Sequence, residues 1–520
     1  MPQPIGESRG RDHLRRRRVV TIALVATATA LAALIAARPA DAGSYIATQC
    51  SSADQGSGAA WERTSSDYRE RRRCSDGGGL QVFQDAGATA HGRYGAWVWR
   101  APAGTVFTSL QVNASLVNGA GHHGELWATR SSGSRVEFGR EHRDFRVHRA
   151  NGAFSRLESM LRCVSGDGCG RASDDEAHAY AKGVFLRVDD RSAPEVKTDG
   201  GSLLGAQVVR GARSLSFTAA DRGGGVRRLS VAANGTGLAS DVRNCDLADG
   251  FATALSPCPR TTTGSWSIDT AGAAFATGPN DIEACASDLA LDGTANRDCA
   301  EHAVWVDNAC PASSQPGAEL TARFAGGRDR VVIRSDRSAH VEGRLAGPSG
   351  GAVANATVCA LTRVALDGSP VAVARTATTD GQGRYELAIP GGASRRVFVH
   401  HAHGSTVVAR HGLSLRSSVR PTLRVKPKRA LTNGDRLRFE GRLPGPACAR
   451  RIVKVQARVG GRWQVFRTDR TEASCRFRAR YRLRSTSAPI RYGFRALVPP
   501  QAGYPYERGH SRTRRVSVSG

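Results

Sequence analysis

Methionine and lysine are scarce in this sequence, and long apolar runs are missing beyond its first 42 residues. The 520 residues include two methionines, and five of the 74 basic residues are lysines. Later apolar stretches are short and alternate with polar residues, and no long segment has the periodicity of an amphipathic helix. No later stretch resembles a membrane helix either. Together these absences predict an all-β fold.

Recognisable catalytic motifs are absent as well. The sequence has no G-x-S-x-G elbow, no H-E-x-x-H, no P-loop and no EF-hand loop. Its cysteines lack the paired C-x-x-C units that are typical of zinc sites. We therefore expect a non-enzymatic protein without a metal or other cofactor. An extracellular hydrolase whose site is assembled from distant residues is the last alternative.

The N-terminus has the pattern of a secretory signal peptide. A basic cap, Arg15–Arg18, precedes the apolar run Val19–Ala37, and the small-x-small site Ala40–Ala42 follows. We predict that residues 1–42 are removed and that the mature protein, secreted or held at the cell surface, begins at Gly43. The apolar run is also long enough for an uncleaved anchor, which is the only membrane contact that the sequence suggests.

The twelve cysteines lie in locally spaced pairs, which in an oxidising compartment favours disulfides. A bridge that closes a loop of about 15 residues contributes roughly 3 kcal/mol in the chain-entropy model. Connectivity does not follow from sequence, but proximity favours five bridges: Cys50–Cys74, Cys163–Cys169, Cys245–Cys258, Cys285–Cys299 and Cys448–Cys475. Cys310 and Cys359 either pair with each other or stay free.

The mature chain of about 480 residues is too long for one hydrophobic core, so we expect tandem β-sandwich domains. We expect them at residues 43–190, 192–311, 338–412 and 420–520, with a linker at 312–337, of which residues 315–336 are alternatively an edge segment. The first resembles the jelly-roll or concanavalin-like sandwiches of secreted proteins. Its candidate strands are Gly79–Phe83, Tyr94–Arg100, Val106–Val117, Glu125–Thr129 and Val184–Val188.

The second unit contains motifs of an Ig-like sandwich. Residues Ser214–Asp221 alternate as a strand that ends in aspartate, and the glycine-rich turn Arg222–Gly225 follows directly. Further on, Ala286–Asp288 leads through Gly293 to Asn296, which fits a late hairpin. In this order the motifs resemble bacterial Ig-like domains, and the resemblance implies a β-sandwich.

The third unit gives the clearest family resemblance. Val341–Leu345 and Ala352–Cys359 are followed by Thr379–Tyr385 and Ile389–Gly392. These segments resemble carboxypeptidase regulatory-like and collagen-adhesin B-type domains, which implies a small accessory sandwich without catalytic residues. Taken end to end, the chain resembles secreted multidomain proteins of high-GC actinobacteria.

Positive charge is concentrated at the C-terminus. Residues 416–520 carry 27 basic and 5 acidic residues, a net charge of +22 out of +28 for the whole chain. Residues 1–42 carry +4, so everything between is nearly neutral. Such a basic region predicts an anionic partner, and an anionic cell-wall polymer or polysaccharide is our first expectation.

Strand alternation places the basic residues of this region on one face. Phe477, Ala479, Tyr481 and Leu483 have inward parity. The residues of opposite parity are our candidate polyanion-binding site: Arg476, Arg478, Arg480, Arg482 and Arg484. No aromatic residues interleave with these arginines on that face, so no specific nucleic acid is expected. The competing interpretation is a solvated face whose arginines reflect the codon usage of a GC-rich genome.

Three tryptophans of the first unit, Trp97, Trp99 and Trp127, are a second candidate site. Exposed rings could stack on sugars, which makes a carbohydrate-binding protein the alternative function, whereas large aromatics more often fill a core. A histidine cluster, His400, His401 and His403, is interpreted as an exposed strand end and not a metal site. The sequence makes no prediction of oligomeric state.

Overall fold

The computed structural model describes residues 43–50, 58–75, 77–85, 87–427, 429–484, 486 and 488–519. The predicted signal peptide lies outside these residues. Within them the regular elements are the strands β1 to β35. No helix in this part of the chain is long and apolar enough to cross a membrane.

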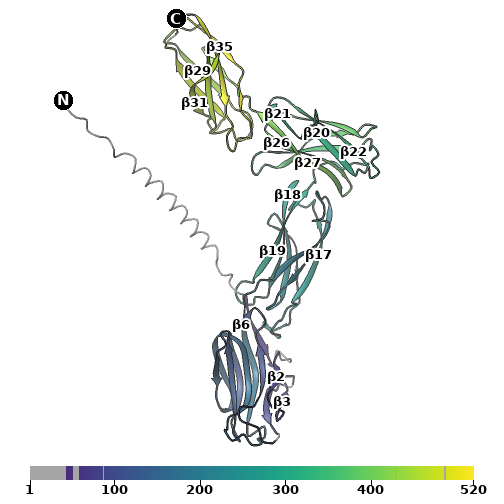
Figure 1. Ribbon diagram of the computed structural model, residues 1–520, viewed down its shortest axis with the longest axis vertical. Helices are drawn as coiled ribbons and strands as arrows, with labels where there is room; N and C mark the ends of the chain where they lie inside the picture. The colour runs from purple at the N-terminus through teal and green to yellow at the C-terminus, as the bar shows by residue number, and fades with distance from the viewer. Residues whose placement is uncertain are drawn as a thin grey trace, which may run out of the picture.

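Four β-rich units follow one another along the long axis of the molecule, from the purple N-terminal unit to the yellow C-terminal one (Figure 1). The ten strands of the first unit form a twelve-stranded sheet together with β15 and β16 of the second. The second unit has further sheets of three and four strands, and the third and fourth units each have sheets of three and five strands. The expected all-β fold of tandem sandwiches is therefore confirmed.

The first unit depends on one very long strand. β9 pairs through its N-terminal half with β6 and through its C-terminal half with both β5 and β7, so it connects different parts of the sheet. β9 was not predicted from the sequence, because the first half of this strand is mostly exposed and rich in charge. The strands of this unit are β1 (Gly43–Gln49), β2 (Ala60–Arg63), β3 (Tyr68–Arg72), β4 (Leu80–Gln84), β5 (Tyr94–Arg100), β6 (Thr105–Val117), β7 (His122–Arg130), β8 (Arg135–Gly139), β9 (His142–Cys163) and β10 (His178–Asp190).

The second unit contacts the first through a short hairpin, in which β16 pairs in parallel with β1 at Ala252 and Ala47. The Tyr45 hydroxyl of β1 also donates to the carbonyl of Leu255 at 2.7 Å. Its strands are β11 (Glu195–Gly200), β12 (Ala212–Ala220), β13 (Val226–Ala233), β14 (Thr236–Val242), β15 (Leu247–Ala248), β16 (Phe251–Ala252), β17 (Thr261–Asp269), β18 (Gly278–Asp288) and β19 (Arg297–Val306).

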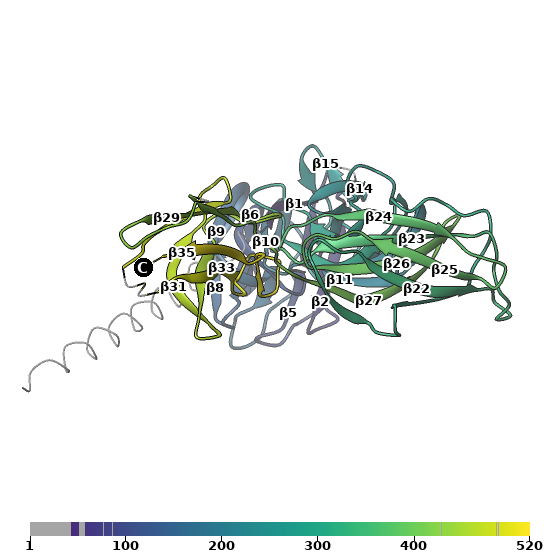
Figure 2. The same cartoon turned by 90° about the horizontal axis from the view of Figure 1, so that it is seen from above.

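The third unit is larger than expected, because residues 312–337 are not a linker but contribute an edge strand to each of its two sheets. That segment contains β20, which pairs with β22, and β21, which pairs in parallel with β27. Leu320, Ala322 and Phe324 alternate into the core and hold β20 in place. Figure 2 shows β23, β24, β26 and β27 side by side in the five-stranded sheet. The strands are β20 (Glu319–Phe324), β21 (Arg330–Arg334), β22 (Ala339–Ala346), β23 (Thr357–Val364), β24 (Val371–Thr378), β25 (Arg384–Ile389), β26 (Arg395–His403) and β27 (Thr406–Ser418).

The fourth unit packs a three-stranded sheet, β28-β29-β32, against a five-stranded one around a shared core. Phe439 contacts Phe494 of the opposite sheet, with ring centroids 5.0 Å apart. The strands are β28 (Arg424–Lys426), β29 (Arg436–Arg442), β30 (Ile452–Val459), β31 (Arg462–Arg470), β32 (Arg476–Arg482), β33 (Ile490–Val498), β34 (Gly509–His510) and β35 (Arg514–Val518).

Six disulfides join all twelve cysteines. The five bridges that proximity favours are all present, and Cys310 pairs with Cys359, the pair that the sequence left open. Because Cys310 follows the last strand of the second unit and Cys359 lies in β23, this bridge covalently links two neighbouring units.

Candidate functional site

The outer surface of the β28-β29-β32 sheet is the candidate site, and we call it the basic face. The inward side chains of these strands, such as Leu437, Phe439 and Phe477, are fully buried in the core. Alternation then places the intervening side chains in solvent. The exposed basic residues of the face are Arg424, Lys426, Arg436, Arg438, Arg442, Arg476, Arg478, Arg480 and Arg482.

The register of the sheet sets arginines directly opposite one another. β29 and β32 are antiparallel, and Arg436 faces Arg482, Arg438 faces Arg480, and Arg442 faces Arg476. Directly opposite residues have Cβ atoms about 4.5–5.5 Å apart, and like charges there destabilise a sheet. The fold therefore tolerates a repulsion that counter-ions or an anionic partner would relieve.

Most guanidinium groups of the basic face have no partner in the described part of the chain. One exception is the Nε of Arg482, which donates to the carbonyl of Gly434 at 3.2 Å. The carboxylate of Glu440, the one acidic residue on these three strands, is 3.2 Å from the Nζ of Lys426. The other arginines of the face form no side-chain hydrogen bond or ion pair with any described residue, so their donors face solvent.

The predicted arginine ladder lies where alternation puts it. Arg476, Arg478, Arg480, Arg482 and the following Arg484 are all exposed. Tyr481, which has inward parity, is 41% exposed because it lies at the edge of the core, against Phe466 at 5.1 Å between ring centroids. The pairing of β32 with β29 does not follow from the alternation of either strand.

The tryptophans do not form a sugar-binding surface, so this candidate site is corrected. Trp97 and Trp99 are fully buried in the core of the first unit, and the Nε1 of Trp97 donates to the carbonyl of Gln81 at 3.2 Å. Trp127 is half-buried on the other face of the sheet, where its Nε1 donates to Glu125 at 2.6 Å. The rings of Trp97 and Trp99 therefore cannot stack on a sugar from solvent, and the guanidinium of Arg135 lies over the ring of Trp127, 4.8 Å from its centroid.

His400 and His401 are buried and do not form the expected exposed strand end. The Nδ1 of His400 lies 2.9 Å from the Oδ2 of Asp307, and its Nε2 lies 2.9 Å from the Nε2 of His411. Burial, together with the neighbouring His400, lowers the pKa of His411 to about 4. Nearby Cys310 is no thiolate ligand, because its sulfur is bonded to Cys359. The cluster joins the second unit to the third.

A cluster of buried carboxylates lies where the first unit meets the second. The amide of Gly224 donates to the Oδ2 of Asp190 at 2.7 Å, and the Nδ2 of Asn296 donates to the Oδ2 of Asp288 at 2.6 Å. Burial raises the pKa of Asp190 and of Asp221, and it raises the pKa of Asp288 to about 7. The three like charges reinforce this effect.

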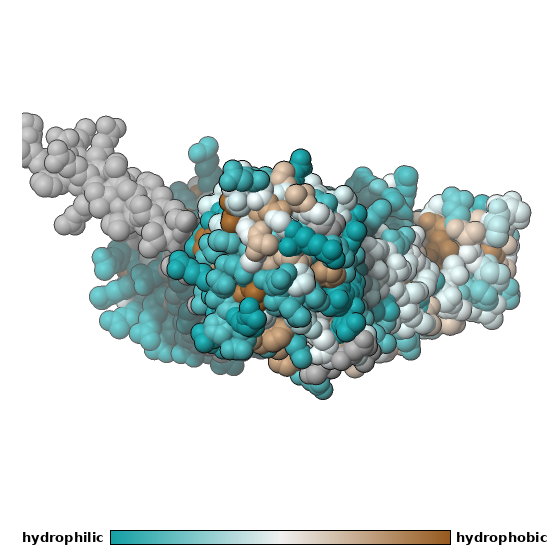
Figure 3. Space-filling model, turned by 90° about the horizontal axis from the view of Figure 1, so that it is seen from below, coloured by the Kyte–Doolittle hydropathy of each residue, from teal (hydrophilic) through white to brown (hydrophobic). Residues whose placement is uncertain are grey.

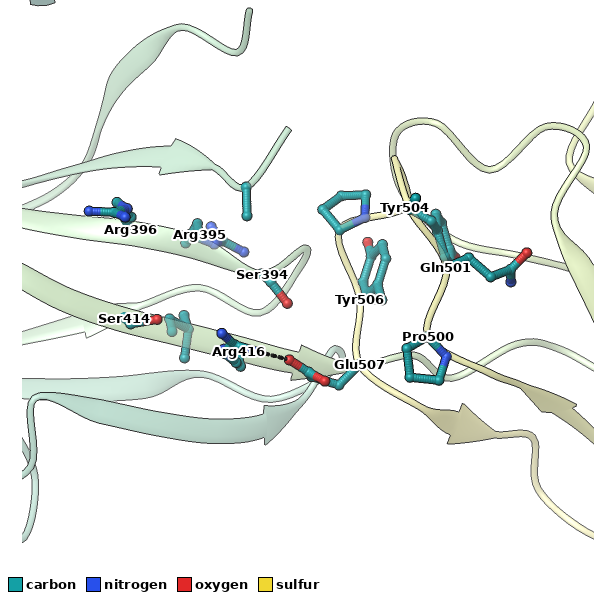
Figure 4. A pocket seen from close by; sticks show the side chains of 14 residues that line it. Ser394, Arg395, Arg396, Ser414, Arg416, Pro500, Gln501, Tyr504, Tyr506 and Glu507 are labelled. Carbon is teal, nitrogen blue, oxygen red and sulfur yellow. Dashed lines mark hydrogen bonds and ion pairs between the residues drawn. The ribbon is translucent and has the colours of Figure 1, made fainter. Parts of the chain in front are cut away.

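A second basic region is the cleft of about 560 Å³ between the third and fourth units (Figure 4). Arg395, Arg396 and Arg416 line one wall, and Arg416 forms an ion pair with Glu507 at 2.6 Å. Burial lowers the pKa of Arg395. Backbone bonds also cross here, including the amide of Ser394 to the carbonyl of Pro505 at 2.8 Å, so the cleft belongs to the joint between the units.

Neither a family model nor a curated protein matches this sequence. Among solved structures, a tetra-tandem repeat in the extending region of a large adhesion protein has 14% identity and a TM-score of 0.21, over 83% of this chain and 96% of that one. The native conformation of E. coli alpha-2-macroglobulin has 9% identity and a TM-score of 0.22, over 85% of this chain and 32% of that one. Such low scores carry no functional argument.

Proposed function

We propose that this is an extracellular, non-enzymatic protein that attaches to anionic surfaces through the basic face of its last unit. The observation that carries the proposal is the set of three opposed pairs of exposed arginines across β29 and β32. The single acidic residue of the face, Glu440, lies opposite Arg478 and forms its ion pair with Lys426. The competing interpretation is a solvated face whose arginines reflect codon usage. A solvated face needs no such pairing of arginines. Codon usage is also shared by the remainder of the mature chain, which is nearly neutral. The six disulfides support a location where thiols are oxidised.

The arrangement of the units supports the same proposal. The basic unit lies at one end of the row and the first unit at the other (Figure 1). In Figure 3, which is seen from below, the first unit lies nearest the viewer, and its surface shows apolar residues scattered among hydrophilic ones. We infer that the other units act as a spacer that holds the basic face away from the first unit. The carbohydrate alternative loses two of its three candidate residues, because Trp97 and Trp99 are buried.

The test is retention of the mature chain on isolated cell walls near physiological ionic strength. We expect retention, release by added soluble polyanion, and loss of most retention when Arg478, Arg480 and Arg482 are changed to Gln. The matched control changes Arg328, Arg330 and Arg375 to Gln, three exposed arginines of the third unit. Equal retention of the two triple variants, or no retention of the parent, would refute the proposal.

A further inference from the structure

One end of the basic face is hollowed. A cavity of about 380 Å³ lies there, and we call it the arginine hollow. Its polar lining is Thr422, Arg424, Glu440, Arg442, Arg476 and Arg478. The four arginines come from all three strands, β28, β29 and β32, so they surround the space rather than follow one line.

The backbone holds this end of the sheet in a fixed shape. A Cβ atom on Gly441 would lie 2.2 Å from the carbonyl oxygen of Thr422 and 2.3 Å from the ring of Phe477, so only glycine fits there. The amide of Arg442 donates to the Oγ1 of Thr422 at 2.9 Å. Arg442 is also directly opposite Arg476. The bases of these side chains are therefore positioned before any ligand arrives.

The charge in the hollow is not balanced by the protein. Glu440 is its one acidic residue, and Lys426 forms an ion pair with it at 3.2 Å. Among the described residues, none accepts a side-chain hydrogen bond from Arg424, Arg442, Arg476 or Arg478. Each guanidinium carries five N–H donors, so the hollow presents many donors that have no protein acceptor.

We propose that the arginine hollow binds a tetrahedral oxyanion, a phosphate or sulfate group carried by an anionic polymer. A carboxylate has two oxygens in one plane, and a single guanidinium fork can satisfy both of them. A tetrahedral group presents oxygens in several directions, which suits donors that arrive from three strands. Phe477, the aromatic residue in the lining of the hollow, is fully buried, so it offers no exposed ring to a sugar or base.

This inference rests on the proposed function and names the chemical group that its partner carries. Its test depends on the shape of arginine and not only on charge. Lysine keeps the charge but lacks the planar fork that holds two oxygens at once. A charge-conserving change in the hollow therefore separates recognition of an oxyanion from general attraction.

The experiment measures binding of the mature chain to polyphosphate, heparin and polygalacturonate of matched charge. The test variant carries Arg442→Lys and Arg476→Lys, and the control carries Arg330→Lys and Arg375→Lys, two exposed arginines of the third unit that lie outside the basic face. We expect the test variant to lose about tenfold in affinity for polyphosphate, heparin or both, and the control less than about twofold. Tighter parent binding to polyphosphate than to heparin identifies phosphate as the group, and the reverse identifies sulfate.

Two results overturn the inference in distinguishable ways. If the lysine variant binds all three polymers like the parent while the Arg478, Arg480 and Arg482 to Gln variant loses binding, the proposed function stands and the hollow is no oxyanion site. The same conclusion follows if the parent binds polygalacturonate more tightly than it binds both other polymers. If the parent binds none of the polymers near physiological salt, the proposed function fails together with the inference.

Discussion

At the scale of single residues, burial decides which side chains can meet a partner. Trp97 and His400 are of types that often form binding sites, yet both are fully buried and contribute to packing. Arg478 and Arg480 lie on the opposite face of a strand from the buried Phe477 and Ala479, and they are exposed. The guanidinium of arginine is more weakly hydrated than the ammonium of lysine, and at such a position it presents the donors that bind oxyanions.

The buried aspartates predict a pH dependence at the same scale. The pKa of Asp288 is about 7 in the folded protein against an ordinary 3.8. Between these values the folded chain keeps a proton that the unfolded chain releases, so stability falls as pH rises. Above about 7 both states are ionised, and the full cost of the buried charge is present. We expect the second unit to unfold at a higher temperature at pH 5 than at pH 7.5.

Calorimetry of the Asp288→Asn variant checks this prediction. An amide does not titrate, so the difference between the two pH values should shrink. Asp249→Asn is the matched control, because Asp249 is exposed in the same unit and its loss should leave the pH dependence unchanged. A parent protein that is equally stable at both pH values, or less stable at pH 5, would contradict the account.

At the scale of strands, the register between β29 and β32 determines which residues of the basic face lie opposite one another. Alternation in the sequence correctly predicted which arginines of β32 point outward, since one buried face fixes the parity of every residue. It could not predict that Arg438 faces Arg480, because β30 and β31 intervene between the paired strands and belong to the other sheet. β20 was missed in a segment taken for a linker, and β9 because half of it has little apolar content.

The opposed pairs make a prediction about stability. Changing Arg480 to Glu places a negative charge opposite Arg438, and replacing repulsion by attraction should stabilise the fourth unit by about 0.2–1 kcal/mol at low salt. The gain should shrink as salt screens the pair. Thermal unfolding at two salt concentrations measures it, with Arg330→Glu as the control, because Arg330 faces Ser414 and no like charge. A destabilised Arg480→Glu variant would show that the pair is not strained.

At the scale of the whole molecule, neighbouring units are tied together by different means. Buried carboxylates and a small hairpin join the first to the second, the Cys310–Cys359 bridge joins the second to the third, and backbone bonds such as Ser394 to Pro505 join the third to the fourth. The four expected units could be predicted from composition and turn signals. The joints could not, because they depend on contacts between residues far apart in the sequence.

The most direct test of the central claim is the salt dependence of binding to a soluble polyanion. Binding through the basic face releases counter-ions, so the logarithm of affinity should fall linearly with the logarithm of salt concentration. Changing Arg478, Arg480 and Arg482 to Gln should lower the slope by up to about three, while changing Arg328, Arg330 and Arg375 should leave it unchanged. A parent slope near zero, or equal slopes for the two triple variants, would contradict attachment through this face.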